Sequence, residues 1–388
     1  MTHETVVPSA QSERVTLLAI ATYAELGGAE VLLCEMLAGV QRRHDIQPTL
    51  FVFGSGAMAD RAGELGLRTV LGRTVRMSRP LTVIRGIWTL RAALAAVRPD
   101  VVHCSNPKAR LLAMAAMVGR RVPCTTQVLD PPPLRDPFVR ATRRAVGTRF
   151  ALTASAADAW RTVLRGQVVQ VITPGVDQQQ QVERADRGDP NAAWRRAGIA
   201  DAADHPRLVM VARLQRYKGV FDLVGAAALV SASHDVRVLL IGPDEPFEPD
   251  VRAELLAEIE THGLAAVVGL SGAISTDDLA ATMREATLLV HPARHEAFGL
   301  VVVEALCLGT PVIASAAAGP SEILGGRGGS LVPIGDTVAL AAEIGRALLD
   351  PALLATWQRE ATQRAAAFQA STMADSYAAT FRSLALAV

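Results

Sequence analysis

Hydrophobic residues along this 388-residue chain fall into short runs that alternate with stretches of helical spacing. In the first half, runs of buried-strand type lie at 15–20, 48–53, 68–71, 100–103 and 122–128. Apolar positions at helical spacing lie between them, at 29–40, 57–65, 82–97 and 107–118, and short elements follow at 138–146, 150–153, 155–164 and 168–172. Strands separated by helices predict a parallel sheet with helices on both faces, which binds ligands at the carboxyl ends of its strands.

A polar stretch at 173–190, TPGVDQQQQVERADRGDP, interrupts this pattern and is predicted to be a linker. Alternation then restarts with strands at 207–212, 236–241 and 266–270 and helices at 218–232, 250–262 and 276–285, before a mostly helical tail from about 336. The length suits two domains. We therefore expect two doubly wound α/β domains, residues 1–185 and 186–370, with a small-molecule cleft between them.

The stretch 291–315, HPARHEAFGLVVVEALCLGTPVIAS, combines a strand end, a turn, a helix and a second strand. The predicted helix starts at Phe298, Gly299 and Leu300, whose unpaired N–H groups would form an anion site. Glu296 precedes the helix and Glu304 lies within it. A carboxylate in so apolar a helix needs a partner, for which a pair of sugar hydroxyls would serve. The alternative is structural, with Glu296 as a cap and Glu304 in an internal ion pair.

Cations and glycines follow other predicted strands. Arg213 ends the strand 207–212, and Lys218 starts the next helix, where a lysine is unfavourable unless an anion is present. Together the two side chains would clamp a diphosphate. Gly28, within LGGAE, and Gly242, within IGPD, would each let a backbone approach a ligand closely, although both could be plain turns.

Polar residues also follow the strand 100–103 in the first half. His103 and Asn106 lie at its tip within VVHCSNPKA, and Lys108 starts the next helix, again an unusual place for a cation. We expect these three side chains to face the cleft. A purely structural role for His103 remains open.

Composition narrows the class of protein. Net charge is +1, but residues 1–185 carry 23 Lys and Arg against 14 Asp and Glu, and the remainder 16 against 24. A basic first half suggests an anionic partner, such as phosphates or a membrane surface, or simply solubilising arginines. Aromatic residues are 4% and we find no nucleic-acid recognition motif, so nucleic acid is the weakest candidate.

The four cysteines are scattered in apolar settings without metal-ligand spacing, which is typical of a reduced cytoplasmic protein. We find no apolar run of the ~20 residues that span a bilayer. Residues 1–13 do not resemble a secretory signal.

These motifs together resemble the retaining glycosyltransferases of family four, which have the GT-B fold. The resemblance rests on LGGAE at 26–30, PDVVH at 99–103, ARLQRYKG at 212–219, the stretch 295–315, GPSEI at 319–323 and LVPIGD at 331–336. Its most specific element is the pair Glu296 and Glu304, which have seven residues between them, including a Phe-Gly.

The resemblance implies roles for these positions. Gly28, Arg213, Lys218, Gly242 and the helix start at 298–300 would bind the donor diphosphate, Glu304 the ribose hydroxyls and Glu296 the donor sugar. It further implies a metal-independent enzyme without a cofactor that retains the anomeric configuration by front-face attack. A C-terminal helix, here 371–388, would pack back on the first, acceptor-binding domain.

Two departures from the family are evident. Leu129 occupies the place of a common histidine, which leaves Asp130, His103 and Asn106 as candidates for that catalytic contact. The second is ITPGVD at the linker entry, where an asparagine before the glycine is more common. Asn106, Lys108 and Asp130 are the candidate acceptor contacts, and the proline-stiffened segment 130–137 is expected to shape the acceptor site.

The predicted function is the transfer of a hexose or N-acetylhexosamine from a nucleotide-sugar, with UDP favoured and glucose or N-acetylglucosamine favoured over mannose. The acceptor is either a soluble natural product, such as an aminoglycoside core, or a lipid-linked glycan intermediate, with peripheral contact to an anionic membrane. The alternatives are a nucleotide-sugar epimerase or phosphorylase of the same fold and a non-catalytic binding module. A nicotinamide oxidoreductase is disfavoured because its glycine fingerprint is missing.

Overall fold

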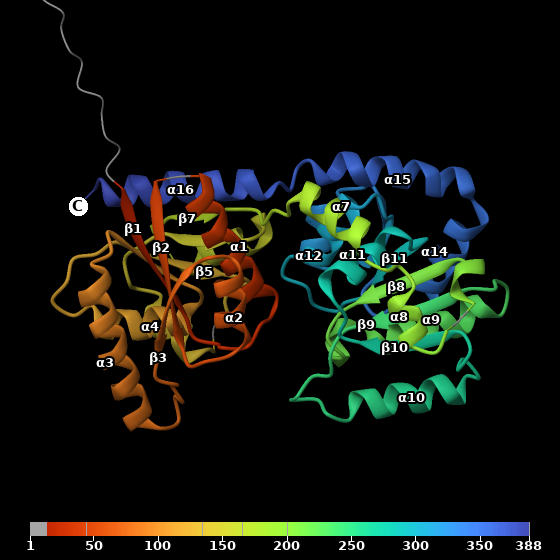
Figure 1. Cartoon of the computed structure of the whole chain (residues 1–388), viewed down its shortest axis with the longest axis horizontal. Coiled ribbons are helices and arrows are strands. Elements are labelled where there is room, and N and C mark those ends of the chain that lie inside the picture. The colour runs from red at the N-terminus through yellow and green to blue at the C-terminus, as the bar shows by residue number, and fades with distance from the viewer. Residues whose placement is uncertain (1–13, 44, 134, 165, 200, 388) are drawn as a thin grey trace, which may run out of the picture. The chain divides into compact units, whose positions relative to one another are not determined.

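The computed structural model describes residues 14–387 except 44, 134, 165 and 200, and it divides into two compact units (Figure 1). Unit 1 contains the chain up to Ile172 together with the residues from Ser371 onward, and unit 2 is Thr173–Ala370. The chain therefore enters unit 2 at the start of the predicted linker and not at residue 186. The 13 N-terminal residues examined for a signal lie outside the described residues.

Unit 1 is a seven-stranded parallel sheet in the order β3-β2-β1-β4-β5-β6-β7. Its strands are β1 (Val15–Ala21), β2 (Ile46–Phe53), β3 (Arg68–Gly72), β4 (Val101–Cys104), β5 (Cys124–Val128), β6 (Arg149–Ala151) and β7 (Val169–Val171). Its helices are α1 (Gly28–Arg43), α2 (Ala57–Glu64), α3 (Pro80–Val97), α4 (Pro107–Ala116), α5 (Pro137–Thr142), α6 (Ala154–Val163) and the C-terminal α16 (Ala370–Ala385). The strand order reverses between β1 and β4, which is where such sheets bind ligands.

Helix α16 is part of unit 1 because its inner face is buried there. The Tyr377 hydroxyl donates to Gln127 Oε1 on β5 at 2.7 Å, and the Tyr377 ring lies 5.0 Å from that of Phe150 on β6. Tyr377 and Phe381 are fully buried. Burial of two aromatic rings and one satisfied polar pair fixes the C-terminal segment on this sheet.

Unit 2 is a six-stranded parallel sheet in the order β10-β9-β8-β11-β12-β13. Its strands are β8 (Arg207–Val211), β9 (Arg237–Ile241), β10 (Val268–Gly272), β11 (Leu288–His291), β12 (Val312–Ser315) and β13 (Gly329–Val332). Its helices are α7 (Gln178–Arg187), α8 (Ala192–Arg196), α9 (Val220–Ser231), α10 (Val251–Thr261), α11 (Thr276–Arg284), α12 (Leu300–Cys307), α13 (Ala318–Leu324), α14 (Thr337–Leu349) and α15 (Pro351–Ala365), with 3₁₀ turns η1 (Ala202–Asp204) and η2 (Arg216–Lys218). Here the order reverses between β8 and β11.

The chain passes between the units at the start of the predicted linker 173–190, but the glutamine-rich part of that stretch is helix α7 and belongs to unit 2. Asp177 caps the helix by accepting from the Gln180 N–H at 3.1 Å, and glutamine is a good helix former. Gln181 and Ala185 are buried, and Arg187 pairs with Asp277 on α11. The stretch is polar because only a narrow face of α7 is buried and the rest of the helix is open to solvent.

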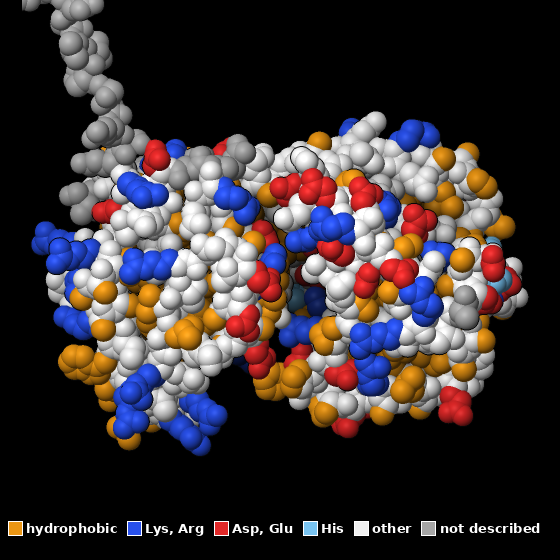
Figure 2. All heavy atoms as spheres, in the orientation of Figure 1, with side chains coloured by type: hydrophobic (Ala, Val, Ile, Leu, Met, Phe, Trp, Pro, Cys, Tyr) orange, Lys and Arg blue, Asp and Glu red, His pale blue; other side chains and the backbone are white. Residues whose placement is uncertain are grey.

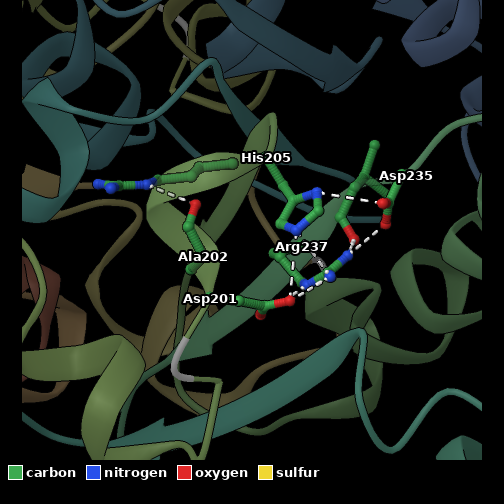
Figure 3. Close-up of polar contacts among 7 residues, drawn as sticks. Asp201, Ala202, His205, Asp235 and Arg237 are labelled. Carbon is green, nitrogen blue, oxygen red and sulfur yellow. Dashed lines mark hydrogen bonds and ion pairs between the residues drawn. The ribbon is translucent and has the colours of Figure 1, made fainter.

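A charge cluster of unit 2 lies at the amino ends of β8 and β9 (Figure 3). Arg237, at the start of β9, pairs with Asp201 and Asp235 and contacts His205 Nε2 at 2.9 Å. The hydrogen bond from Arg237 lowers the pKa of Asp201 to about 2. Because ligands bind at the opposite edge of a parallel sheet, we interpret this cluster as structural.

All four cysteines are buried and free of disulfides, as expected. Within the described ranges, α3 is the single helix that is long and apolar enough, by length and composition alone, to cross a membrane. It is 18 residues long with a mean hydropathy of 1.3, so the sequence-based exclusion of such a segment was too strict.

Candidate functional site

The predicted diphosphate ligands meet at one edge of the second sheet. Arg213 and Lys218 follow β8, whereas Glu296 follows β11, and these two strands are direct neighbours. The turns that leave the two strands therefore lie together at the point where the strand order reverses. Arg213, Lys218 and Glu296 were predicted from separate motifs, and the sheet order places their strands side by side.

Glu296 is bound on two sides. Its Oε2 atom accepts from Lys218 Nζ at 2.9 Å and lies 3.0 Å from Nε2 of His291, the last residue of β11. The Lys218 and Glu296 side chains are 18% and 15% exposed, so the ion pair is largely shielded from solvent. Gly219 lets the turn after Lys218 pack this closely, because a Cβ there would lie 2.1 Å from the Pro292 carbonyl oxygen.

Glu296 is held in its ionised form. Burial alone would raise the pKa of this carboxyl, but the hydrogen bond and charge of His291 and the Lys218 ammonium lower it from 4.5 to about 2. A carboxylate that is ionised at neutral pH thus lies beside a lysine that the sequence assigns to a diphosphate. Lys218 carries three N–H donors, and its ion pair with Glu296 uses one of them.

Arg213 is oriented by Glu245, a residue that the sequence analysis did not name. Arg213 Nη1 lies 3.1 Å from Glu245 Oε2, and Glu245 is buried while Arg213 is 43% exposed. Gly242 follows β9 directly, with φ of 151°, and a Cβ there would lie 1.9 Å from the Ala212 carbonyl oxygen. The structure therefore requires glycine at this position for packing of its own backbone.

The start of α12 lies at the same edge of the second sheet as Arg213 and Glu296. This helix begins at Leu300, two residues later than predicted, and Gly299 is its N-cap with φ of 100°. Phe298 is buried and packs against Phe368, with ring centroids 6.1 Å apart, so its side chain belongs to the core. Glu304 is half-buried on α12 and makes interactions of its own.

The reversal point of the first sheet carries a second polar group. Gly28 starts α1 after β1, and a Cβ there would meet nothing within 4 Å, so packing of the described chain does not require a glycine. Asn106 caps α4: its Oδ1 accepts from the Ala109 N–H at 2.8 Å, and its Nδ2 donates to Thr22 Oγ1 at 2.9 Å. Asn106 is therefore engaged in joining β1 to α4.

Lys108 lies in the first turn of α4, half-buried, with its ammonium 5.1 Å from the centre of the Tyr23 ring. Burial lowers the pKa of Lys108. Lys108 and Gly28 thus remain candidates for ligand contact in unit 1, together with Asp130.

His103 is wrong as a catalytic prediction. It is 1% exposed, its Nδ1 lies 2.8 Å from Thr125 Oγ1, and burial lowers its pKa to about 3. The rings of Phe150, Tyr377 and Phe381 lie within 6.2 Å of it, centre to centre. His103 is therefore a neutral, buried residue of the core of unit 1 in this structure.

Leu129 and Asp130 follow β5 and are both half-buried. Leu129 lines a small, mainly apolar pocket with residues of α1 and with His103 and Tyr377. The Asp130 carbonyl oxygen accepts from Trp160 Nε1 at 2.7 Å, which fixes the start of the 130–137 segment. Leu134, at the centre of that segment, lies outside the described residues.

The main residue that sequence reasoning missed is His291. A histidine at a strand end five residues before Glu296 was a visible signal, but its contact depends on how the turn folds back. His291 Nδ1 is buried and has no hydrogen-bond partner among the described residues. No group of three or more His, Cys, Asp or Glu side chains in the described chain is arranged to hold a metal ion.

Two family models match the chain. Residues 26–180 match "Glycosyltransferase Family 4", and residues 196–364 match "Glycosyl transferases group 1". The chain belongs to these glycosyltransferases, as its motifs predicted.

Curated relatives agree with this class. A D-inositol 3-phosphate glycosyltransferase of Catenulispora acidiphila is 36% identical over 225 residues, 55% of this chain and 51% of that protein. An MMP alpha-(1->4)-mannosyltransferase of Mycolicibacterium hassiacum is 35% identical over 136 residues, 34% of this chain and 32% of that protein. The match therefore spans about half the length of the first relative and about a third of the length of the second.

Solved structures confirm the fold. HepE of Anabaena, in complex with UDP-glucose, matches with a TM-score of 0.81 over 95% of this chain and 100% of that chain, at 23% identity. Sucrose-phosphate synthase of Thermosynechococcus elongatus matches with a TM-score of 0.80 over 97% of this chain and 100% of that chain, at 20% identity. The two Rossmann-like parallel-sheet units are those of the GT-B fold.

Proposed function

We propose that this chain transfers a hexose or N-acetylhexosamine from a nucleotide-sugar to an acceptor hydroxyl, with retention of configuration at the anomeric carbon. The observation that carries the proposal is the arrangement of Arg213, Lys218, His291 and Glu296 at the reversal point of the second sheet. Unit 2 would bind the donor and unit 1 the acceptor.

Arg213 and Lys218 would bind the donor diphosphate. Charge-assisted hydrogen bonds from a guanidinium and an ammonium neutralise the negative charge that develops on the leaving nucleoside diphosphate. The Gly242 turn and the N–H groups at the start of α12 would add neutral donors. Gly28 of unit 1 remains a predicted donor-binding residue. Because cations of the chain supply this stabilisation, the proposed reaction requires neither a metal nor another cofactor.

Glu296 and Glu304 would bind the two sugars of the donor. Glu296 is ionised at neutral pH, so it accepts hydrogen bonds from sugar hydroxyls and does not act as a general acid. Its ion pair with Lys218 positions the lysine before the donor arrives. Glu304, on α12, would accept from the ribose hydroxyls. In front-face attack the leaving phosphate would take the proton of the acceptor hydroxyl.

A UDP-sugar is the favoured donor, which is supported by the UDP-glucose complex of HepE. The acceptor remains one of two classes: a soluble hydroxyl compound, consistent with relatives named for inositol 3-phosphate, or a lipid-linked glycan intermediate. Lys108 and Asp130 would contact it, and the 130–137 segment would shape its site. A lipid-linked acceptor would place the chain at the cytoplasmic face of a membrane.

The test is donor breakdown without an acceptor. The chain is incubated in turn with UDP-glucose, UDP-N-acetylglucosamine, GDP-mannose and ADP-glucose, and the products are followed by proton NMR. We expect slow release of nucleoside diphosphate from one donor, with the sugar first appearing in the donor's own anomeric configuration. Lys218→Ala should abolish the release, whereas Arg346→Ala, an exposed arginine paired on α14, should not.

Other products would contradict transfer. A changed sugar epimer would indicate an epimerase, and a sugar 1-phosphate formed only with added phosphate would indicate a phosphorylase. If the chain binds a donor but does not break it down, whether or not an acceptor is present, it is a binding module.

A further inference from the structure

The stretch around α3 is basic without interruption. Between Glu64 and Asp100 the chain contains seven arginines and no acidic residue: Arg68, Arg73, Arg76, Arg79, Arg85, Arg91 and Arg98. All seven are exposed. They account for much of the excess of positive charge in the first half, and they are confined to β3, α3 and the connection between them.

These arginines have no carboxylate partner in the part of the chain that the structure describes. No described Asp or Glu forms an ion pair with any of the seven, whereas Arg61, just before the stretch, pairs with both Glu35 and Glu64. Many arginines of unit 2 are paired in the same way, for example Arg216 with Glu254 and Arg294 with Asp222. A group of unpaired positive charges presents a strong field to an anionic partner.

Helix α3 also exposes large apolar side chains. Leu81, Ile84 and Trp88 are 69%, 51% and 67% exposed, and their spacing of three and four residues places them on one helical face. The opposite face, with Leu90 and Leu94, is buried in the core of unit 1. The outer stripe therefore contributes nothing to that core.

The arginines before α3 are fixed relative to this stripe. The Arg76 N–H donates to Thr82 Oγ1 at 3.0 Å, and the Thr82 hydroxyl lies 2.8 Å from the Arg79 carbonyl oxygen, so the connection folds onto the first turn of α3. Arg73 and Arg85 line one open hollow together with the hydroxyls of Thr74 and Thr82. Figure 2 shows basic and hydrophobic side chains gathered over this end of unit 1.

We propose that α3 and the connection 73–79 dock unit 1 on an anionic lipid bilayer, with Leu81, Ile84 and Trp88 in the interface and the arginines on lipid phosphates. Charge complementarity selects this occupant, since an apolar stripe in a segment whose charged residues are all arginines matches acyl chains beneath an anionic surface. Trp88 is of the residue type enriched at such interfaces. The helix lies on the bilayer and does not cross it, because Leu90 and Leu94 are committed to the protein core.

This inference deepens the proposed function by favouring a lipid-linked acceptor, but its test does not require transfer. Trp88 is a built-in reporter, since the other three tryptophans, Trp160, Trp194 and Trp357, are buried. The full chain is mixed with vesicles of phosphatidylcholine, with or without phosphatidylglycerol. We expect flotation with the anionic vesicles only, loss of flotation in high salt, and a blue shift of tryptophan emission on binding.

Two variants locate the surface. Arg76→Gln with Arg79→Gln should weaken vesicle binding by roughly thirtyfold, and Trp88→Ser should weaken it and remove the blue shift. The matched controls lie in unit 2: Arg327→Gln with Arg359→Gln for charge, and the 75%-exposed Leu349→Ser for apolar area. Both controls should bind vesicles as the unchanged chain does.

Several results would overturn the proposal. They are equal binding to neutral vesicles, no binding at low salt, equal weakening by the control variants, or self-association of the chain that Trp88→Ser abolishes. Donor breakdown without vesicles should be unchanged in all of these variants. If the unchanged chain breaks down a donor but does not bind anionic vesicles, the docking surface alone is rejected. If it binds anionic vesicles but breaks down no donor, the proposed function alone is rejected.

Discussion

Glu296→Gln is the substitution that best separates charge from shape at the proposed donor site. The carboxyl pKa falls from 4.5 to about 2 in the folded protein, and one pKa unit corresponds to about 1.4 kcal/mol. The ionised group therefore contributes about 3 kcal/mol to stability at pH 7. Because the folded-state pKa is depressed, this contribution is present above pH 4.5 and declines as the pH falls towards 2, with about 2 kcal/mol remaining at pH 3.5.

The glutamine variant keeps the volume of the side chain but loses this charge. Differential scanning calorimetry of both proteins at pH 7 and pH 3.5 measures the effect, which at pH 7 should lower the melting temperature of the transition of unit 2 by roughly 6–12 °C. The difference in melting temperature between the two proteins should be smaller at pH 3.5. The matched control is Glu254→Gln, which removes a carboxylate from the exposed ion pair with Arg216 and should shift melting far less. An equal difference in melting temperature at both pH values would refute the claim that the ionised carboxylate stabilises unit 2.

Two further substitutions test the packing around the sites. Gly242→Ala should lower the melting temperature strongly in calorimetry, because its Cβ would lie 1.9 Å from the Ala212 carbonyl oxygen at a φ of 151°. The control, Gly263→Ala, has open space at a φ of 68° and should cost only about 1 kcal/mol. Equal losses of stability in the two variants would show that the Gly242 turn relaxes freely. Tyr377→Phe removes the donor to buried Gln127 Oε1 and should cost about 1–3 kcal/mol in urea unfolding of unit 1, and an unchanged midpoint would mean that this hydrogen bond does not hold α16.

Much of the fold could be predicted from the sequence, because the strands and helices are strongly patterned. The alternation of apolar runs and amphipathic stretches gave both parallel sheets, and the motifs named Arg213, Lys218 and Glu296. The secondary-structure prediction failed where the sequence is mostly polar. Residues 178–187 were assigned to a linker because glutamine-rich composition hides the capping aspartate and the narrow stripe of Gln181 and Ala185 that packs against the rest of unit 2.

The errors within the sites have a different cause. His103 ends a strand, so exposure at the strand tip was expected, but Tyr377 and Phe381, from the far end of the chain, cover it. His291 and Glu245 were missed because their contacts join positions that only the strand order brings together. Local sequence states what each turn contains, and it does not state which turns are neighbours.

Binding of nucleoside diphosphates is the most direct test of the donor site. Isothermal titration calorimetry with UDP, GDP and ADP should show that one of them, with UDP favoured, binds the unchanged chain. Arg213→Ala and Lys218→Ala should each weaken that binding at least about tenfold, since each removes a charge-assisted hydrogen bond, and Arg346→Ala should leave it unchanged. Absence of binding to all three nucleotides, or equal affinity in the three variants, would contradict the account.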